Sequence, residues 1–312
     1  MTEKQDRLMT RKKFIKISSA GLLGVGLLGK STALLGKSLK NQVEKNPERR
    51  MLGRTGIKVT ALGYGASHVT EPSLIKRALD LGINFIDTRG DYSRGENEMM
   101  LGKVIKGIRR KVIIQSKIRI RTKAKGEALH APEMRKRLRL KMETSLNQSL
   151  KDLRTEYIDI MLIHGIKTPD IINHETIKEF LMEAKKTGKI RACGFSSHAN
   201  QVELVRDAIR DNFYDVIMVP YNHKGSYVHS RRGHYNEWDQ PSLEKEFKRA
   251  EKNGVGIVAM KTCSGGPYSP DGVSRPTYRN ALEWVSSHSY ISTMAVAMGN
   301  FKQIKENIQV MF

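Results

Sequence analysis

Short apolar runs alternate with longer amphipathic segments along residues 51–312. The runs are rich in Val, Ile and Met and mostly lack polar alternation, which is typical of strands buried on both faces of a parallel sheet. Eight strands are expected, at Ala61–Ala66, Asn84–Thr88, Val112–Lys117, Asp159–His164, Ile190–Ser197, Val216–Asn222, Gly256–Lys261 and Thr293–Gly299. Helices expected between them include Pro72–Leu81, Pro132–Leu150, Thr176–Thr187 and Pro241–Asn253. Glycines that follow some of these segments, at 82, 188 and 254, are typical of helix ends.

Consecutive strand–helix units predict an α/β fold, a closed (β/α)8 TIM barrel over residues 48–312. The units occupy roughly 260 residues, close to the length of about 250 that is typical of such barrels. Apolar pairs flank the turn Gly53–Gly56, so a β-hairpin should precede the barrel. A doubly wound open sheet is the alternative, but it needs a phosphate-binding loop that Gly63–Ala66 does not supply. In a barrel, functional side chains are expected at the C-terminal ends of the strands.

Residues 1–47 form a separate signal, anchor or linker region. The basic stretch Thr10–Lys16 resembles a twin-arginine export signal, with Lys12 in place of the second arginine, and an apolar run follows at Ile17–Gly29. That run is too short for a comfortable membrane span, which needs about 20 residues. Export to the periplasm, or tethering to the outer face of the inner membrane, is expected; a cytoplasmic protein with a non-functional signal is the alternative. Gly24–Gly29 matches nucleotide-loop patterns but lacks the surrounding sheet that such loops require.

Composition narrows the classes of partner. The 312 residues carry 55 Lys plus Arg against 32 Asp plus Glu, a formal charge of +23, which favours anionic partners. Two cysteines without a C-x-x-C motif exclude a disulfide framework and cysteine-ligated clusters. The densest basic stretch, residues 117–141, has no interleaved aromatic residues, so no nucleic-acid partner is expected. This stretch is either a solvated surface or a region that steers an anionic substrate or cofactor.

Four chemically suited residues follow successive predicted strands. Asp87 ends the second strand and Tyr92 follows it, Lys117 ends the third strand, and His164 ends the fourth. A nearby ammonium group lowers the pKa of a tyrosine, an aspartate can hold that ammonium group in place, and a histidine can orient a carbonyl oxygen. The set is suited to protonating an oxyanion as a hydride reaches carbon.

The chain resembles the aldo-keto reductase family from about Arg50 to Gln309. The resemblance is carried by Leu52–Gly56, Leu79–Thr88, Tyr92–Glu98, Gln115–Lys117, Leu162–His164, Gly194–His198, Val219–Asn222 and Glu306-Asn307. It implies a (β/α)8 barrel, a nicotinamide cofactor, usually NADP, and reduction of an aldehyde or ketone. It also implies roles for the four residues: Tyr92 as the acid, Lys117 and Asp87 as its tuners, and His164 as the residue that orients the carbonyl.

The resemblance also implies where the cofactor binds. The positions are Ser196, Ser197, Met218, Tyr221, Met260, Lys261, Gly299, Asn300, Lys302, Gln303 and Asn307. Several of them depart from the family pattern. Ser197 replaces the usual asparagine, Met218 the usual glutamine and Met260 a frequent aromatic residue, and no arginine matches those that bind the 2′-phosphate. The resemblance implies NADP, and these departures leave NAD as the alternative.

The sequence thus predicts an NAD(P)H-dependent oxidoreductase that acts on a small-molecule carbonyl compound. The alternative is a nucleotide-binding sensor or assembly subunit on the same barrel with little or no turnover. Ser93 stands where the family usually has glycine, and Arg89 where it has a small residue.

His223, His229 and His234 follow the sixth predicted strand, but their irregular spacing and basic neighbours do not predict a metal site, and we expect none.

Overall fold

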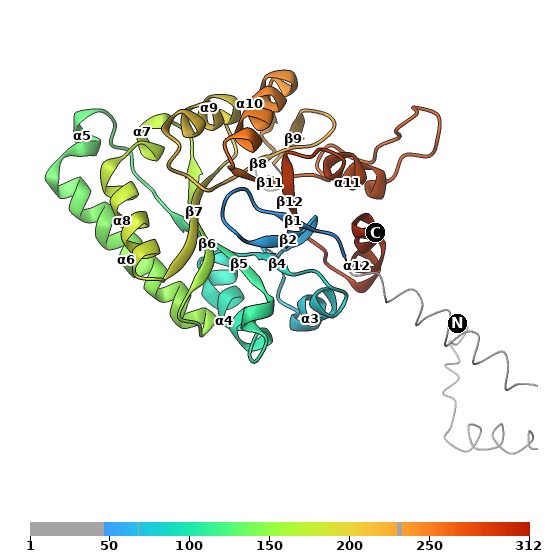
Figure 1. Ribbon diagram of the computed structural model, residues 1–312, viewed down its shortest axis with the longest axis horizontal. Coiled ribbons are helices and arrows are strands. Elements are labelled where there is room, and N and C mark those ends of the chain that lie inside the picture. Colours follow the sequence, from blue (N-terminus) through green and yellow to red (C-terminus); the bar gives the residue numbers. More distant parts are fainter. Residues whose placement is uncertain (1–46, 68, 230–232) are drawn as a thin grey trace, which may run out of the picture. The chain divides into compact units, whose positions relative to one another are not determined.

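A closed eight-stranded barrel forms the body of the protein (Figure 1). The computed structural model describes residues 47–67, 69–229 and 233–312. The predicted export signal lies outside these residues. The barrel strands, in chain order, are β3 (Leu62–Gly65), β4 (Phe85–Asp87), β5 (Ile113–Arg119), β6 (Ile158–Ile166), β7 (Ile190–Ser197), β8 (Val216–Pro220), β11 (Gly256–Met260) and β12 (Ile291–Val296). All eight pair in parallel, and β12 closes the barrel against β3. The predicted TIM barrel is confirmed.

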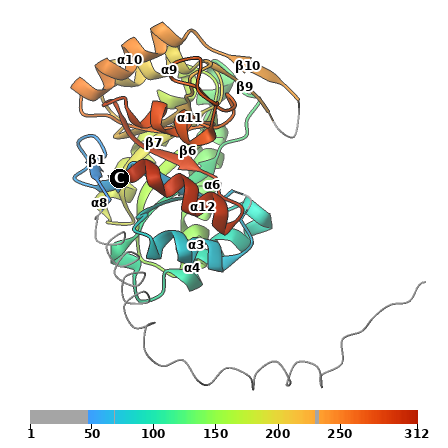
Figure 2. The ribbon, with the colours of Figure 1, turned by 90° about the vertical axis from the view of Figure 1, so that its right-hand side faces the viewer.

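Helices surround the barrel (Figures 1 and 2). They are α3 (Pro72–Asp80), α4 (Glu96–Val104), α5 (Glu127–His130), α6 (Pro132–Leu153), α7 (Pro169–Ile172), α8 (Glu175–Lys186), α9 (Gln201–Asp211), α10 (Gln240–Lys252), α11 (Tyr278–Ser286) and α12 (Phe301–Asn307). Short 3-10 turns lie at Tyr92–Gly95, Arg109–Lys111 and Ile308–Met311. Proline at the first helical positions and a side-chain cap from Asp239 explain why α10 begins where it does. Within the described residues, no helix combines the length and apolar character that a membrane crossing requires.

The predicted N-terminal hairpin is β1 (Arg49–Met51) paired antiparallel with β2 (Lys58–Thr60). Its Leu52, Ile57 and Val59 join the apolar interior of the barrel. Gly53, with a φ of +52°, lies so close to the start of β11 that a Cβ atom would be 2.4 Å from the backbone of Gly254 and Gly256. The hairpin therefore closes the N-terminal end of the barrel and leaves the C-terminal end for a site.

Two strands extend farther than the sequence predicts. The third and fourth predicted strands were expected to end at Lys117 and His164, but β5 continues to Arg119 and β6 to Ile166. The register of β6 shifts between His164 and Ile166, where Gly165 has a φ of +76°. These extensions were not predicted because Arg119 and Gly165 interrupt the apolar pattern on which strand prediction relies. A second hairpin, β9 (Ser226–Val228) with β10 (Tyr235–Glu237), follows β8.

Candidate active site

A buried ion pair lies at the C-terminal mouth of the barrel. Lys117 Nζ donates to Asp87 Oδ1 across 2.5 Å and to the Thr88 carbonyl oxygen across 2.9 Å. Gln115 Nε2 donates to the same Asp87 oxygen across 2.7 Å. Both charged residues are only 4% exposed. Because each charge is desolvated, the pair depends on these contacts, which fix the ammonium group of Lys117 in one position.

Tyr92 lies above this pair in the 3-10 turn that follows β4. Its ring is half-buried; the Lys117 ammonium nitrogen lies 5.5 Å and the Arg89 guanidinium carbon 4.4 Å from the ring centroid. Ser93 and Arg94 both adopt left-handed backbone conformations, with φ of +49° and +58°. The family's usual glycine at position 93 would avoid a cost of about 1–2 kcal/mol there. The turn therefore keeps a strained backbone directly beside Tyr92.

His164 contributes a neutral ring to the same mouth. Its Nδ1 lies 2.7 Å from the Ser196 hydroxyl oxygen, and its ring contacts His198 edge-on with centroids 6.1 Å apart. Burial is the main cause that lowers the pKa of His164 to about 2, and the positive charges of Lys117 and Arg89 contribute to the same shift. If the Ser196 hydroxyl donates to Nδ1, the proton of the neutral ring is on Nε2, where it can be donated to an oxygen.

The pKa of His164 predicts how stability changes with pH. In the unfolded chain a histidine takes up a proton near pH 6.5, whereas folded His164 stays neutral down to about pH 2. The unfolded state therefore binds more protons below pH 6.5, and the free energy of unfolding falls as pH falls. Between about pH 6 and pH 4 the wild type should lose about 1.4 kcal/mol per pH unit more than His164→Gln. Denaturant unfolding of both proteins at several pH values measures this difference; parallel curves would contradict it.

A cavity of about 530 Å³ opens over these residues. It is lined by Tyr92 and His164 together with Ser67, Arg89, Asp91, Ser93, Arg119, Gly165, Ile166, Lys167, His198, Ala199, Tyr227, His229, His234, Asn236 and Lys261. Arg119 belongs to the basic stretch 117–141, for which steering of an anion was one of two interpretations, whereas His198 and Tyr227 were not predicted as site residues. His198 is the last residue of the matched motif Gly194–His198, so the sequence offered a signal for it, whereas Tyr227 lies in a three-residue strand too short to be recognised from sequence.

The side chains at the predicted cofactor positions on β7 and β8 already have hydrogen-bond partners within the protein. Ser196 bonds to His164, while the Ser197 hydroxyl oxygen lies 2.5 Å from the carbonyl oxygens of both Ile166 and Ala199, to which it can donate its one hydrogen. Met218 is buried, and its sulfur accepts from Gln115 Nε2 across 3.3 Å.

At the ends of β8 and β11, two predicted positions are buried and one lines the cavity. Tyr221 is fully buried, with its hydroxyl bonded to Tyr290 and Glu244, so its ring lies outside the cavity lining. Met260 is buried at the end of β11. Lys261 follows it and lines the cavity, and burial lowers the pKa of its ammonium group.

The remaining predicted cofactor positions follow β12. Gly299, Asn300, Lys302 and Gln303 are all exposed. The Asn300 side chain caps α12 by accepting from the Gln303 backbone N–H, and the Gln303 side chain accepts from the Gly299 N–H across 2.7 Å. Asn307, half-buried, is the last residue of α12. The structure thus brings Asp87, Tyr92, Lys117, His164 and Lys261 to one mouth of the barrel. The segment Gly299–Gln303 follows the C-terminal end of β12 at the same mouth.

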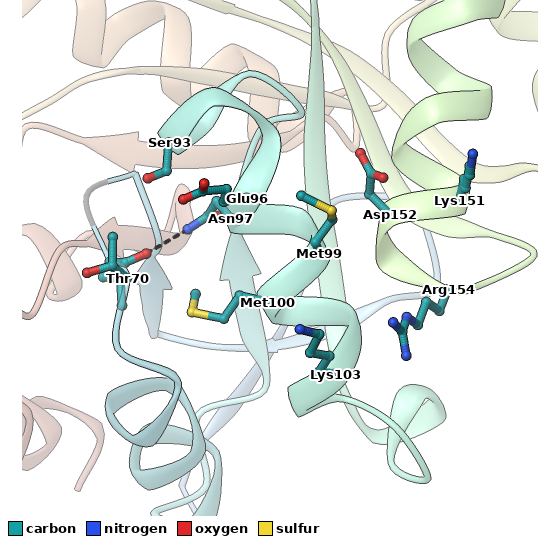
Figure 3. A pocket seen from close by; sticks show the side chains of 11 residues that line it. Thr70, Ser93, Glu96, Asn97, Met99, Met100, Lys103, Lys151, Asp152 and Arg154 are labelled. Atoms are coloured by element: carbon teal, nitrogen blue, oxygen red, sulfur yellow. Dashed lines mark hydrogen bonds between the residues drawn. The ribbon is translucent and has the colours of Figure 1, made fainter.

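A second cavity, of about 540 Å³, lies beside α4 and the C-terminal end of α6 (Figure 3). Its labelled side chains mix the carboxylates of Glu96 and Asp152 with the cations of Lys103, Lys151 and Arg154. Neither Tyr92 nor His164 lines it. Mixed charge defines no single class of ligand, so the candidate active site is the cavity at the barrel mouth.

Comparison with known proteins identifies the family. Residues 63–280 match the model of the aldo/keto reductase family. An L-galactose dehydrogenase from Arabidopsis thaliana is 28% identical over 302 residues, covering 84% of this chain and 87% of that protein. A methylglyoxal reductase from Salmonella typhi is 31% identical over 221 residues, covering 69% and 71%. The holo form of an aldo-keto reductase from Bacillus halodurans superposes with a TM-score of 0.64 at 25% identity, covering 85% and 90%.

The chain therefore belongs to the aldo/keto reductase family. It is an NAD(P)-dependent oxidoreductase. The alternative hypothesis of a nucleotide-binding sensor or assembly subunit with little or no turnover is not favoured. The donor set fits a nicotinamide dinucleotide. Lys261 at the mouth and Lys302, whose side chain is 84% exposed, are ammonium groups suited to phosphate oxygens, and the loop at Gly299–Gln303 adds amide groups.

Proposed function

We propose that this enzyme reduces an aldehyde or ketone to an alcohol, with Tyr92 as the general acid. The observation that carries the proposal is the placement of Tyr92 and neutral His164 in one cavity wall directly above the Asp87–Lys117 pair. When bound, the nicotinamide supplies the hydride that reaches the carbonyl carbon. The phenol proton passes to the carbonyl oxygen, and the tyrosine regains a proton from solvent.

The surrounding residues prepare this proton transfer. The Lys117 ammonium group, held by Asp87 and the Thr88 carbonyl oxygen, stabilises the negative charge that forms on Tyr92. The Arg89 guanidinium carbon lies 4.4 Å from the centroid of the same ring and adds a second positive charge. His164 remains neutral because its pKa is about 2, so it donates a hydrogen bond and does not compete with Tyr92 as the acid.

Ser196 is a positioning residue for His164. Ser196→Ala removes one hydrogen bond at Nδ1, worth about 1 kcal/mol, and should lower kcat about fivefold. The Michaelis constant for cofactor should change little, since the hydroxyl is used by His164. Ser286→Ala is the matched control, because this buried serine on α11 accepts from Arg50 across 3.2 Å, far from the mouth. Steady-state kinetics that show equal effects of the two substitutions would contradict the role of Ser196.

We propose NADPH as the preferred cofactor. Support comes from the exposed Lys302 in the first turn of α12 and from Lys261 at the mouth. Lysines act on a phosphate as point charges, so the preference should be smaller than that of a bidentate arginine site. Fluorescence titration of the full chain with NADPH and NADH side by side tests this proposal. Tighter binding of NADPH, reduced by Lys302→Gln, is expected; equal affinities would show that the 2′-phosphate is not bound.

A panel of carbonyl compounds tests the proposed reaction. Methylglyoxal belongs in it because a relative is named for that activity. The expected result is oxidation of NADPH at 340 nm together with formation of the alcohol. Tight cofactor binding with no turnover of any carbonyl would overturn the proposed function.

We also propose that residues 1–47 direct export to the periplasm, through the basic stretch Thr10–Lys16 and the apolar run that follows. Fractionation of bacteria that produce the full chain tests this proposal, with Arg11→Lys in the motif and Arg7→Lys outside it as matched variants. The wild type and Arg7→Lys should be found in the periplasmic or membrane fraction, and Arg11→Lys in the cytoplasm. All three proteins in the cytoplasm would contradict export.

A further inference from the structure

A strongly basic groove continues from the active-site mouth. Its volume is about 1060 Å³, and its cationic lining residues are Arg119, Arg121, Lys123, Lys125, Arg137 and Lys167. We call this set the basic groove. The groove shares Arg119, His164, Gly165, Ile166 and Lys167 with the active-site cavity, so the two form one connected surface.

The charge of the basic groove is poorly compensated. Among the described residues that line it, Asp170 is the only carboxylate. Arg119 pairs with Asp91 at 3.9 Å. For Arg121, Lys123, Lys125, Arg137 and Lys167, no carboxylate oxygen of the described residues lies within the 4 Å of an ion pair. Like charges gathered around a concave surface repel one another and attract an anion.

The strand extensions explain how the groove forms. Gln115, Lys117 and Arg119 alternate along β5 on the face toward the barrel axis, so Arg119 lies one step above the active-site lysine. The register of β6 against β7 shifts between His164 and Ile166, and Lys167, directly after the strand, lines both cavities. The groove is therefore made by residues immediately beyond two active-site side chains.

The groove lies across the barrel from the proposed cofactor loop. In the closed order of strands, β3, β4 and β5 separate β12 from β6 on one side, and β7, β8 and β11 on the other. The loop Gly299–Gln303 follows β12, whereas the groove is formed by the segments after β5 and β6 and by α6. Figure 1 shows α5 and α7 on one side of the barrel and α12 on the opposite side. The proposed cofactor loop and the basic groove thus lie in different sectors of the mouth.

We propose that the substrate is an aldehyde or ketone that also carries a carboxylate or phosphate group, with its carbonyl at Tyr92 and His164 and its anionic group in the basic groove. This inference rests on the proposed function. The reaction is unchanged: hydride adds to the carbonyl carbon, Tyr92 supplies the proton, and the alcohol leaves with its anionic group intact.

Two matched pairs of carbonyl compounds test the proposal with the full chain and NADPH. The pair 4-oxobutanoate and butanal differs by a carboxylate, and the pair glyceraldehyde 3-phosphate and glyceraldehyde by a phosphate. In at least one pair the charged member should have the higher kcat/KM, and the pair that responds identifies the anion. Added salt should raise KM for the charged member and leave the neutral member unchanged.

The double variant Arg121→Gln/Arg137→Gln tests which residues cause the preference. Its control is Lys106→Gln/Lys136→Gln, which removes the same charge from exposed positions outside the lining of either cavity. The groove variant should raise KM for the charged member about tenfold and change kcat little. The control variant, the neutral members and the Kd for NADPH should stay within about twofold.

The outcomes separate this inference from the proposed function. If neutral and charged members are reduced equally well, and the groove variant matches the control, the anionic-substrate inference is wrong while the reductase function stands. If the groove variant weakens NADPH binding, the groove holds the cofactor and the inference is overturned. If no carbonyl compound is reduced although NADPH binds, the proposed function fails and the inference fails with it.

Discussion

Tyr92→Phe is expected to lower kcat by about a hundredfold to ten-thousandfold, because general acid catalysis contributes effects of that size. The substitution removes only the hydroxyl group. The ring keeps its contacts with the Lys117 and Arg89 cations, so folding and cofactor binding should be retained. Steady-state oxidation of NADPH gives the loss of kcat, and fluorescence titration of the same preparation gives the Kd of the cofactor.

Tyr157→Phe provides the matched control for this experiment. Tyr157 lies just before β6, at the opposite end of that strand from His164, where its ring contacts the Arg109 guanidinium group with the carbon 4.1 Å from the centroid. Its turnover should equal that of the wild type. A Tyr92→Phe enzyme that retains wild-type kcat would show that the proton comes from another group or from water.

Lys117→Met is expected to have the second largest effect, on both activity and stability. It leaves the carboxylate of Asp87 buried without its cationic partner, a change that typically costs about 3–5 kcal/mol. Turnover should also be lost, because no ammonium group remains to stabilise negative charge on Tyr92. Denaturant unfolding and NADPH oxidation measure the two effects separately.

The double variant Asp87→Asn/Lys117→Met separates structure from catalysis. With both charges removed, the desolvation penalty disappears, and most of the lost stability should return. Activity should not return, since the ammonium group is still missing. If the double variant recovered turnover together with stability, Lys117 would have only a structural role.

Most of the fold could be predicted from the sequence, because the barrel strands are buried on both faces and therefore consist of dense apolar runs. Ile190–Ser197 was predicted with its observed bounds, and the other seven strands differ only at their ends. The ends of β5 and β6 were missed because Arg119 and Gly165 interrupt the apolar pattern, although the hydrogen bonds of the sheet continue past them.

Contacts between side chains on different strands of the barrel were harder to predict from the sequence than the positions of the strands. Strand ends alone predicted that Asp87, Lys117 and His164 would lie together, since parallel strands end at one mouth. The bond between His164 and Ser196 joins β6 to β7, and the connection between the mouth and the basic groove depends on a register shift. Such features arise from three-dimensional register, which a linear pattern of residues does not encode.

The position of Tyr221 shows the limit of family resemblance. It matches a motif on which the cofactor site was predicted, yet in this structure its hydroxyl contacts Tyr290 and Glu244, and its ring packs against Phe247. Its surroundings come from α10, α11 and the start of β12, segments that the resemblance does not cover closely. A matched motif therefore locates a residue along a strand without fixing the direction of its side chain.

Transfer of deuterium tests the central claim most directly. Full-length protein is incubated with NADPH deuterated at C4 of the nicotinamide, in each of its two stereoisomers, together with a carbonyl compound, and the alcohol is analysed by mass spectrometry and NMR. The account predicts that one stereoisomer delivers its deuterium to the carbinol carbon, one atom for each NADPH oxidised, and that Tyr92→Phe slows this transfer by the same factor as its loss of kcat. Oxidation of NADPH without labelled alcohol from either stereoisomer would contradict it.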